Sequence, residues 1–323
     1  MRSIEHDNDH RTILFCGAGD RAFCAGGDVL HIADASLAQS EWNRRWFSSE
    51  FLLNSFISNL KKPVISIWKG IVMGGGVGLS IYGSHRIATD STVFAMPETT
   101  IGFMPDIGAS YFLSHSVKHP GVGLFLGMTG HRLNGADTLL CGLATHYIPQ
   151  IRIDDFISAL ENRRDVDQVL SEFSTTSPDT PESSLNSEML SSIATYFSHS
   201  AGEPFSAFFQ RLEKGSKNGD KFAKSTMGIL RQKCPLTVRV WYESFKIGST
   251  QSLAQVLARE YRMCIHMTEI DPHNFREGVR AQLIDKGKGK PADFIPGRIE
   301  DVSGDMVDRI VKSTAGGDLS PII

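Results

Sequence analysis

The chain has 323 residues, of which 41% are hydrophobic and 21% charged, and its formal net charge is −3 at pH 7. This composition is that of an ordinary globular protein, and it gives no reason to expect nucleic acid or an anionic membrane as a partner. Five dispersed cysteines without C-x-x-C spacing, and histidines without an H-E-x-x-H pattern, argue against a disulfide framework and against a metal site.

Strand-like and helix-like segments alternate in the first half of the chain. Four short runs predict strands, at residues 12–17, 63–70, 85–90 and 145–148. Between them, apolar residues recur at helical spacing over about 37–60, a second helix-like run begins near Gly75, and a third covers 121–130. This alternation predicts an α/β core. The most apolar stretch, 70–83, is too short and too glycine-rich to span a bilayer.

The chain changes character after about residue 150. A Ser/Thr/Pro-rich stretch at 171–184 predicts a loop, and the segments that follow it have helical spacing. We therefore predict two regions: a core over 1–150 that carries the functional site, and a helical region over 151–323 that packs on the core.

Two glycine-rich loops each follow a strand-like run and precede a helix-like run: "FCAGGDV" at 23–29 and "MGGGVGL" at 73–79. Backbone N–H groups at the start of a helix lack intrahelical partners, and glycine lets a substrate approach them closely. Two such groups directed at one oxygen would form an oxyanion hole. Tight strand–helix packing is the alternative explanation, but the presence of two similar loops favours a function. Neither a phosphate-binding G-x-x-x-x-G-K-[ST] nor a G-x-S-x-G motif occurs.

The stretch "FAMPETTIGFMPDIGA" at 94–109 places Glu98 and Asp106 eight residues apart among apolar residues. Charged groups are costly in such surroundings unless they are paired or used in chemistry. The residues alone leave two interpretations open, a polar turn or half of an active site. Asp28, at the end of the first glycine loop, is expected to be a structural acid at a helix N-terminus.

Several segments carry a resemblance to a known family. They are "AFCAGGDV", "KPVISIWKGIVMGGGVGLSIYGSHRIATD", "FAMPETTIGFMPDIGASYFL", "TGHRLNGADTLLCGLATHYI", "LAREYRMCIHM" and "FREGVRAQLIDKGKGKPADF". Together they resemble the crotonase superfamily, and within it the 3-hydroxyisobutyryl-CoA hydrolase branch. The resemblance covers most of the chain and implies a spiral of ββα units followed by helices.

The resemblance also implies roles for particular residues in an acyl-CoA thioester site. By motif position, the N–H groups of Gly27 and Gly75 would bind the thioester oxygen. Glu98 and Asp106 would be catalytic and would contact the substrate, and Glu50, on the first long helix, would also bind it. Glu98 would either attack the carbonyl directly or activate a water molecule, and both routes stay open.

Position 78 separates reactions within the superfamily. Typical enoyl-CoA hydratases carry a catalytic Glu three residues after the oxyanion glycine, whereas this chain has Gly78. We therefore expect hydrolysis of 3-hydroxyisobutyryl-CoA, or of 3-hydroxypropionyl-CoA, in valine degradation. The alternatives are another crotonase reaction, such as enoyl-CoA hydration or isomerisation, and a non-catalytic homologue acting as a mitochondrial ribosomal small-subunit protein.

The same resemblance sets expectations for the partners of the chain. CoA is part of the substrate, so no cofactor is expected. We expect no nucleic acid or membrane partner, and a homo-oligomer is possible. The role implies a mitochondrial location in a eukaryote, with no transit sequence visible, and a cytoplasmic one otherwise. Family members begin with a strand pair and a helix before the strand at 12–17, and without these we expect an exposed sheet edge and weaker CoA binding.

Overall fold

The computed structural model describes residues 7, 10–35, 41–162, 165–175, 183–198, 200, 202–317 and 319. The chain forms two compact units, and each is assembled from three separate stretches of sequence. Unit 1 comprises 1–26, 57–95 and 132–186, and unit 2 comprises 27–56, 96–131 and 187–323. The boundary near residue 150 was drawn from composition alone, and it stays a prediction.

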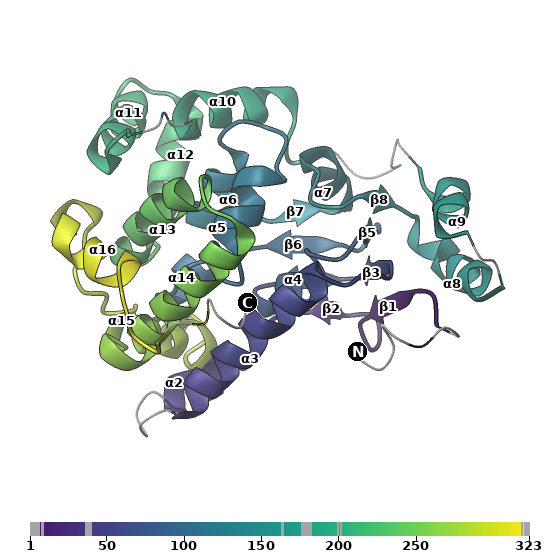
Figure 1. The fold of residues 1–323 in the computed structure, drawn as a ribbon. Coiled ribbons are helices and arrows are strands. Elements are labelled where there is room, and N and C mark those ends of the chain that lie inside the picture. Colours follow the sequence, from purple (N-terminus) through teal and green to yellow (C-terminus); the bar gives the residue numbers. More distant parts are fainter. Residues whose placement is uncertain are drawn as a thin grey trace. The chain divides into compact units, whose positions relative to one another are not determined.

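Unit 1 contains two four-stranded sheets (Figure 1). The first has the order β1 (Ile13–Cys16), β3 (Val64–Trp68), β5 (His85–Ala88) and β8 (His146–Tyr147), and all of its pairs are parallel. These are the four strands that the sequence predicts. All five residues of β3 are buried, which explains why this strand reads as a continuous apolar run rather than an alternating one.

The second sheet of unit 1 is built from strands of two or three residues that the sequence analysis did not find. Its order is β2 (Ala22–Cys24), β4 (Ile71–Met73), β6 (Val93–Ala95) and β7 (Leu133–Asn134), and only the last pair is antiparallel. Such short strands show no periodicity that a sequence pattern could reveal.

Helices cover the first sheet on one side. Residues Ile65 and Ile87 of the sheet share a buried cluster with Phe156 of α8 (Ile153–Asn162) and Val169 of α9 (Val166–Phe173). The predicted loop at 171–184 is therefore partly wrong, because its first three residues complete α9, whereas 176–182 lie outside the described residues. The remaining helices of unit 1 are α4 (Gly75–Gly78), α7 (Gly135–Cys141) and the 3-10 helix η2 (Gln150–Arg152).

Unit 2 consists of helices and connecting loops. Its first stretches contain α2 (Val29–Ala35), most of α3 (Glu41–Ser58), the 3-10 helix η1 (Glu98–Ile101), α5 (Ala109–His115) and α6 (Val122–Thr129). The rest is helical, as the sequence predicts, with α10 (Ser187–Phe197), α11 (Phe205–Lys217), α12 (Lys221–Leu230), α13 (Pro235–Gly248), α14 (Leu253–Ile265), the π-helix η3 (His266–Ile270), α15 (His273–Val279), the π-helix η4 (Arg280–Ile284), η5 (Ile299–Asp301) and α16 (Gly304–Val311).

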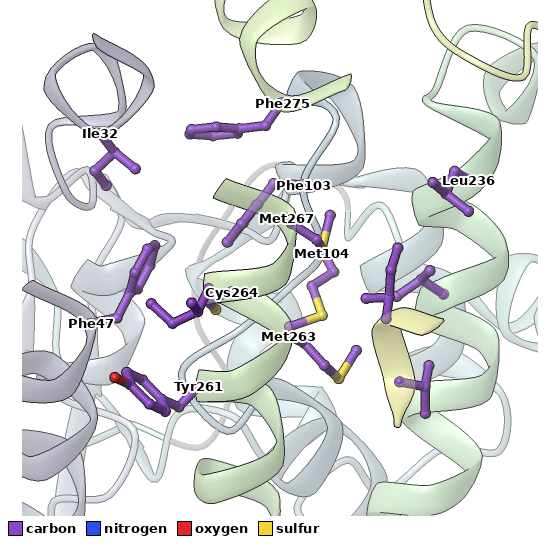
Figure 2. Packing of buried hydrophobic residues seen from close by; sticks show 14 of the residues in the cluster. Ile32, Phe47, Phe103, Met104, Leu236, Tyr261, Met263, Cys264, Met267 and Phe275 are labelled. Carbon is purple, nitrogen blue, oxygen red and sulfur yellow. The ribbon is translucent and has the colours of Figure 1, made fainter. Parts of the chain in front are cut away.

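The core of unit 2 is rich in aromatic and sulfur-containing side chains. Figure 2 shows Phe47 from α3, Phe103 from the loop after η1, and Cys264 from α14 together with several methionines. Among the described residues, no helix combines the length and the apolar character needed to cross a membrane.

Candidate active site

Glu98 is the first residue of η1, and only 6% of it is exposed. Burial raises the pKa of its carboxyl to about 8, although the positive charge of Lys233 acts in the opposite direction. Its Oε2 atom is fully enclosed, yet no group among the described residues donates a hydrogen bond to it. A buried carboxylate oxygen without a partner is costly to keep in a folded protein, so the position calls for a functional explanation.

Contacts from distant parts of unit 2 hold η1 in place. The Thr99 hydroxyl donates to the Met128 carbonyl at the end of α6 (3.1 Å), and the Cys234 N–H, at the start of α13, donates to the Thr99 carbonyl (2.9 Å). After η1 the chain turns at Gly102, whose φ is 69°. A Cβ on Gly102 would lie 2.0 Å from the Asn274 carbonyl oxygen, so only glycine fits there. Glu98 therefore projects from a rigid segment.

Asp106 lies on the strained part of the same loop, and it is also 6% exposed. The next residue, Ile107, has a φ of 54°, a backbone region that β-branched residues rarely adopt. Gly108 follows with a φ of 82°. Strain of this kind persists only where the surroundings fix the conformation, and it concentrates at functional sites.

The surroundings that fix this loop come from α14. Glu260 is fully buried and accepts hydrogen bonds from the Gly108 N–H (2.7 Å) and the Ser110 N–H (3.1 Å), at the start of α5. Arg259 donates to the Ser110 hydroxyl (2.9 Å), and Glu260 accepts a hydrogen bond from that hydroxyl. A carboxylate is thus placed at the N-terminus of a helix, where backbone N–H groups favour a negative charge. Glu260 holds the loop that carries Asp106.

Cys264 lies one helical turn after Glu260 and contacts Asp106 directly. Its thiol donates to Asp106 Oδ2 at an S···O distance of 3.6 Å, and the thiol is completely buried (Figure 2). A thiol is a weak donor. Burial raises the pKa of Asp106 well above its usual range, the negative charges of Glu50, Glu98 and Glu260 raise it further, and the Cys264 hydrogen bond opposes the rise only partly.

Glu50 is half-buried on α3. Burial raises its pKa to about 7, while a hydrogen bond from the Trp46 side chain, one turn earlier, lowers it. Trp46 also packs against Gly27: a Cβ on Gly27 would lie 3.1 Å from the indole ring. The Gly27 N–H has no acceptor among the described residues. Asp28, the next residue, accepts from the His31 N–H (3.1 Å) at the start of α2, which confirms it as a helix N-terminal acid.

Gly75, the other expected oxyanion residue, lies in unit 1. It opens the short helix α4, after Gly74 with a φ of 51°, and its N–H has no acceptor in the described part of the chain. A Cβ on Gly26 would lie 3.4 Å from the Gly75 nitrogen, and a Cβ on Gly76 would lie 2.2 Å from the Cys24 carbonyl oxygen. The glycines in this loop are therefore required by close backbone packing, and the Gly75 N–H is left without a partner.

Comparisons with known proteins agree with the family resemblance that the sequence shows. A family model described as enoyl-CoA hydratase/isomerase matches residues 1–311. The chain belongs to the enoyl-CoA hydratase/isomerase family. The spiral crotonase fold and the acyl-CoA substrate class that the sequence implies are thereby confirmed.

Named relatives are similar over nearly the whole chain. A mitochondrial 3-hydroxyisobutyryl-CoA hydrolase from Xenopus tropicalis is 36% identical over 98% of this chain and 80% of its own length. The 3-hydroxyisobutyryl-CoA hydrolase 1 of Arabidopsis thaliana is 37% identical, over 95% and 81% respectively. Among solved structures, a carnitinyl-CoA dehydratase from Mycobacterium thermoresistibile is 33% identical with a TM-score of 0.83, over 96% of this chain and 85% of that one.

The expected site residues are distributed over both units of the chain. Gly27, Glu50, Glu98 and Asp106 all belong to unit 2, and Asp106 is electrostatically coupled there to Glu50 and Glu98. Gly75 belongs to unit 1. A set of carboxyl groups whose pKa values are pushed upward can hold or release protons near neutral pH, which is what general acid–base chemistry requires.

Sequence reasoning missed the groups that support these acids, namely Trp46, Lys233, Glu260 and Cys264. Lys233 is held by a hydrogen bond to the Thr100 hydroxyl (2.6 Å) and carries the charge that acts on Glu98. One signal was available for Glu260. It occupies a core-facing position of an amphipathic helix, where a charge is expected only if it has a purpose.

Proposed function

We propose that this chain hydrolyses 3-hydroxyisobutyryl-CoA to the free hydroxy acid and CoA, with Glu98 as the group that attacks the thioester or activates water. The observation that carries this proposal is the state of Glu98. Its carboxyl is buried, one of its oxygens has no partner in the described part of the chain, and its negative charge raises the pKa of Asp106. The named hydrolases that resemble the chain over nearly its full length support the substrate.

The reaction follows from the protonation states of the two acids. In the water route, the ionised form of Glu98, which becomes the major form above about pH 8, removes a proton from water while the water oxygen bonds to the thioester carbon. In the direct route, a Glu98 oxygen forms that bond itself and gives a mixed anhydride, which water then hydrolyses. In both routes the C–S bond breaks with its electron pair on sulfur.

Asp106 is the acid in this scheme. Its pKa lies well above the usual range, so it retains a proton under conditions in which an ordinary aspartate is ionised. We propose that it gives this proton to the departing CoA sulfur. We also propose the roles that the family resemblance implies, in which Glu50 binds the acyl group and the N–H groups of Gly27 and Gly75 donate to the thioester oxygen.

The direct test replaces Glu98 by glutamine, which keeps the shape and removes the ionisable group. We expect thiol release from 3-hydroxyisobutyryl-CoA to fall about 10²- to 10⁴-fold. Glu161→Gln, on the exposed end of α8, is the matched control and should retain normal release. Near-normal release by Glu98→Gln would remove Glu98 from the mechanism, and no release by the unaltered protein would refute the substrate.

Enoyl-CoA hydration is the rival reaction within the family. Hydratases flank the water with two carboxylates, whereas residue 78 of this chain is a buried glycine within α4. We therefore expect no loss of the conjugated absorbance of crotonyl-CoA under conditions in which thiol is released from the hydroxyacyl substrate. We propose that the reaction belongs to valine degradation and that the protein acts in the mitochondrion if its source is a eukaryote. The relatives from Xenopus tropicalis and Mus musculus, which are named mitochondrial, support this location.

A further inference from the structure

Asn54 is a buried side chain on α3 that the proposed mechanism does not yet use. It is 1% exposed, and neither its amide nitrogen nor its amide oxygen has a hydrogen-bond partner among the described residues. A buried polar group without a partner costs stability, and an amide has two such groups. A protein that keeps one is expected to satisfy it with something that binds there.

The helix geometry shows which way Asn54 faces. It follows Glu50 by four residues, and side chains at this spacing lie one above the other on a helix. At about 100° per residue, Asn54 lies about 20° from the direction of Phe47 and about 40° from that of Glu50. Phe47 stacks on Phe103, with ring centroids 6.1 Å apart. Asn54 is therefore on the face of α3 that packs toward the loop between Glu98 and Asp106.

A second contact bounds this face from α14. The ring of Phe51 meets the edge of Tyr261 at 6.2 Å, and Tyr261 follows Glu260 directly. Two acids of unit 2 already have donors, since Glu50 has the Trp46 side chain and Asp106 has the Cys264 thiol. Asn54, by contrast, has neither a donor nor an acceptor among the described residues.

We propose that Asn54 is a specificity-determining residue that, together with Glu50, binds the 3-hydroxyl of the acyl group. A hydroxyl donates one hydrogen bond and accepts others. Its O–H would donate to the Glu50 carboxylate, and its oxygen would accept from the Asn54 Nδ2–H. An acyl group without this hydroxyl would leave the amide unpaired, as it is in the free protein, and the enzyme would discriminate against it. This inference rests on the proposed function.

The test compares two substrates that differ only in that hydroxyl, 3-hydroxyisobutyryl-CoA and isobutyryl-CoA. We expect Asn54→Leu to lower kcat/KM for the hydroxylated substrate at least tenfold and to leave the value for isobutyryl-CoA nearly unchanged. The preference ratio should therefore fall by the same factor. The folded state should not be weakened, because the leucine removes two unpaired polar groups from the interior.

Asn43→Leu is the matched control. Asn43 is also a buried asparagine of α3, but its amide donates to the Ile32 carbonyl (3.3 Å). Its replacement should lower thermal stability and leave the preference ratio unchanged. An unchanged ratio for Asn54→Leu, or an equal loss for both substrates, would overturn the proposal.

Binding separates this inference from the hydrolase assignment. The dissociation constants of the two acyl-CoAs are measured by calorimetry on Glu98→Gln protein, with and without Asn54→Leu. A preference for the hydroxylated ligand that disappears with Asn54→Leu supports the role of Asn54 even if the unaltered protein releases no thiol. Equal affinities in the presence of Asn54 refute it even if hydrolysis is observed.

Discussion

Asp137 of unit 1 and Asp106 of unit 2 are both buried aspartates, but their surroundings differ. Asp137 closes a capping box at the start of α7 and accepts hydrogen bonds from the hydroxyls of Ser183 and Ser184. Among the described residues, Asp106 has a single weak donor, the Cys264 thiol, and three other acids raise its pKa. The first arrangement stabilises a fold, whereas the second raises the pKa of a carboxyl that our proposed mechanism uses as an acid.

The same contrast extends beyond these two residues. In unit 1, buried polar groups such as the Thr92 hydroxyl are paired with the backbone. That hydroxyl donates a hydrogen bond to the Trp68 carbonyl. Unit 2 holds Glu98, one of whose oxygens has no hydrogen-bond partner within the ranges that the structure describes. The number of hydrogen-bond donors around a buried acid therefore helps to separate a structural role from a chemical one. A carboxylate whose oxygens already accept several hydrogen bonds has few lone pairs left to interact with a substrate.

Exchanging each aspartate for asparagine tests this contrast most strongly. Asp106→Asn removes the proton that we assign to the leaving sulfur, so kcat/KM for thiol release should fall about 10³-fold. Its melting temperature should not fall. Asp137→Asn should do the opposite, with a lower melting temperature and normal kcat/KM for the folded enzyme, since the amide nitrogen cannot accept from the serine hydroxyls. Parallel effects of the two changes on activity would erase the distinction.

A pH series tests the cost of keeping Glu98 in the interior. Its pKa is about 8 in the folded protein against an ordinary value of 4.5, so folding takes up a proton between these limits. Stability is therefore highest below about pH 4.5 with respect to this group, and it is lost as the pH rises through 8. Glu98→Gln abolishes this loss, which we expect to be about 5 kcal/mol over the whole range.

The readout is the difference in melting temperature between Glu98→Gln and the unaltered protein, measured at pH 5 and pH 8. The variant should gain several degrees more at pH 8 than at pH 5. Glu161→Gln, an exposed change in unit 1, should show no such gain. A pH-independent difference for Glu98→Gln would mean that Glu98 is not held in a protonated state.

Glycine substitutions test the packing that each unit requires. Gly76→Ala in unit 1 places a Cβ 2.2 Å from the Cys24 carbonyl oxygen, so the backbone must shift, and we expect a loss of about 1–3 kcal/mol. Gly228→Ala, in α12 of unit 2, meets open space and should stabilise by about 0.5–1 kcal/mol through helix propensity. Urea denaturation of the two variants measures both signs. If both variants changed the free energy of unfolding in the same direction, the loop around Gly76 would not be as tightly packed as the structure indicates.

The sequence could predict those parts of the molecule that local patterns determine. The strands β1 and β3 appear as apolar runs, and the acids Glu98 and Asp106 stand out because their neighbours are apolar. The strands β2, β4, β6 and β7 could not be found, because two or three residues carry no period. Their existence depends on pairing with distant segments.

The supporting shell of the site was hidden for the same physical reason. Glu260 and Cys264 reach the Asp106 loop from about 150 residues further along the chain, as their separations of 152 and 158 residues show. Asn54 reads as an ordinary polar residue until its burial is known. Local residue types could thus single out the candidate reacting groups, but only the tertiary structure shows which residues shift the pKa values of those groups.

Cys264 provides the finest test, because it changes a proton affinity without changing a charge. Its thiol donates to Asp106, and this hydrogen bond lowers the pKa of Asp106 against the larger effect of burial. A hydroxyl is a stronger donor than a thiol, so Cys264→Ser should lower the pKa of Asp106, and Cys264→Ala should raise it.

The pH profile of kcat/KM measures these shifts, because its alkaline limb reports the pKa of the catalytic acid. It should move to lower pH in Cys264→Ser and to higher pH in Cys264→Ala, by about half a unit each way. Cys141→Ser, at a buried cysteine of unit 1, should leave both limbs in place. Shifts in the same direction for Cys264→Ser and Cys264→Ala would show that the cysteine only fills space, whereas opposite shifts would identify it as the residue that positions the Asp106 carboxyl and sets its proton affinity.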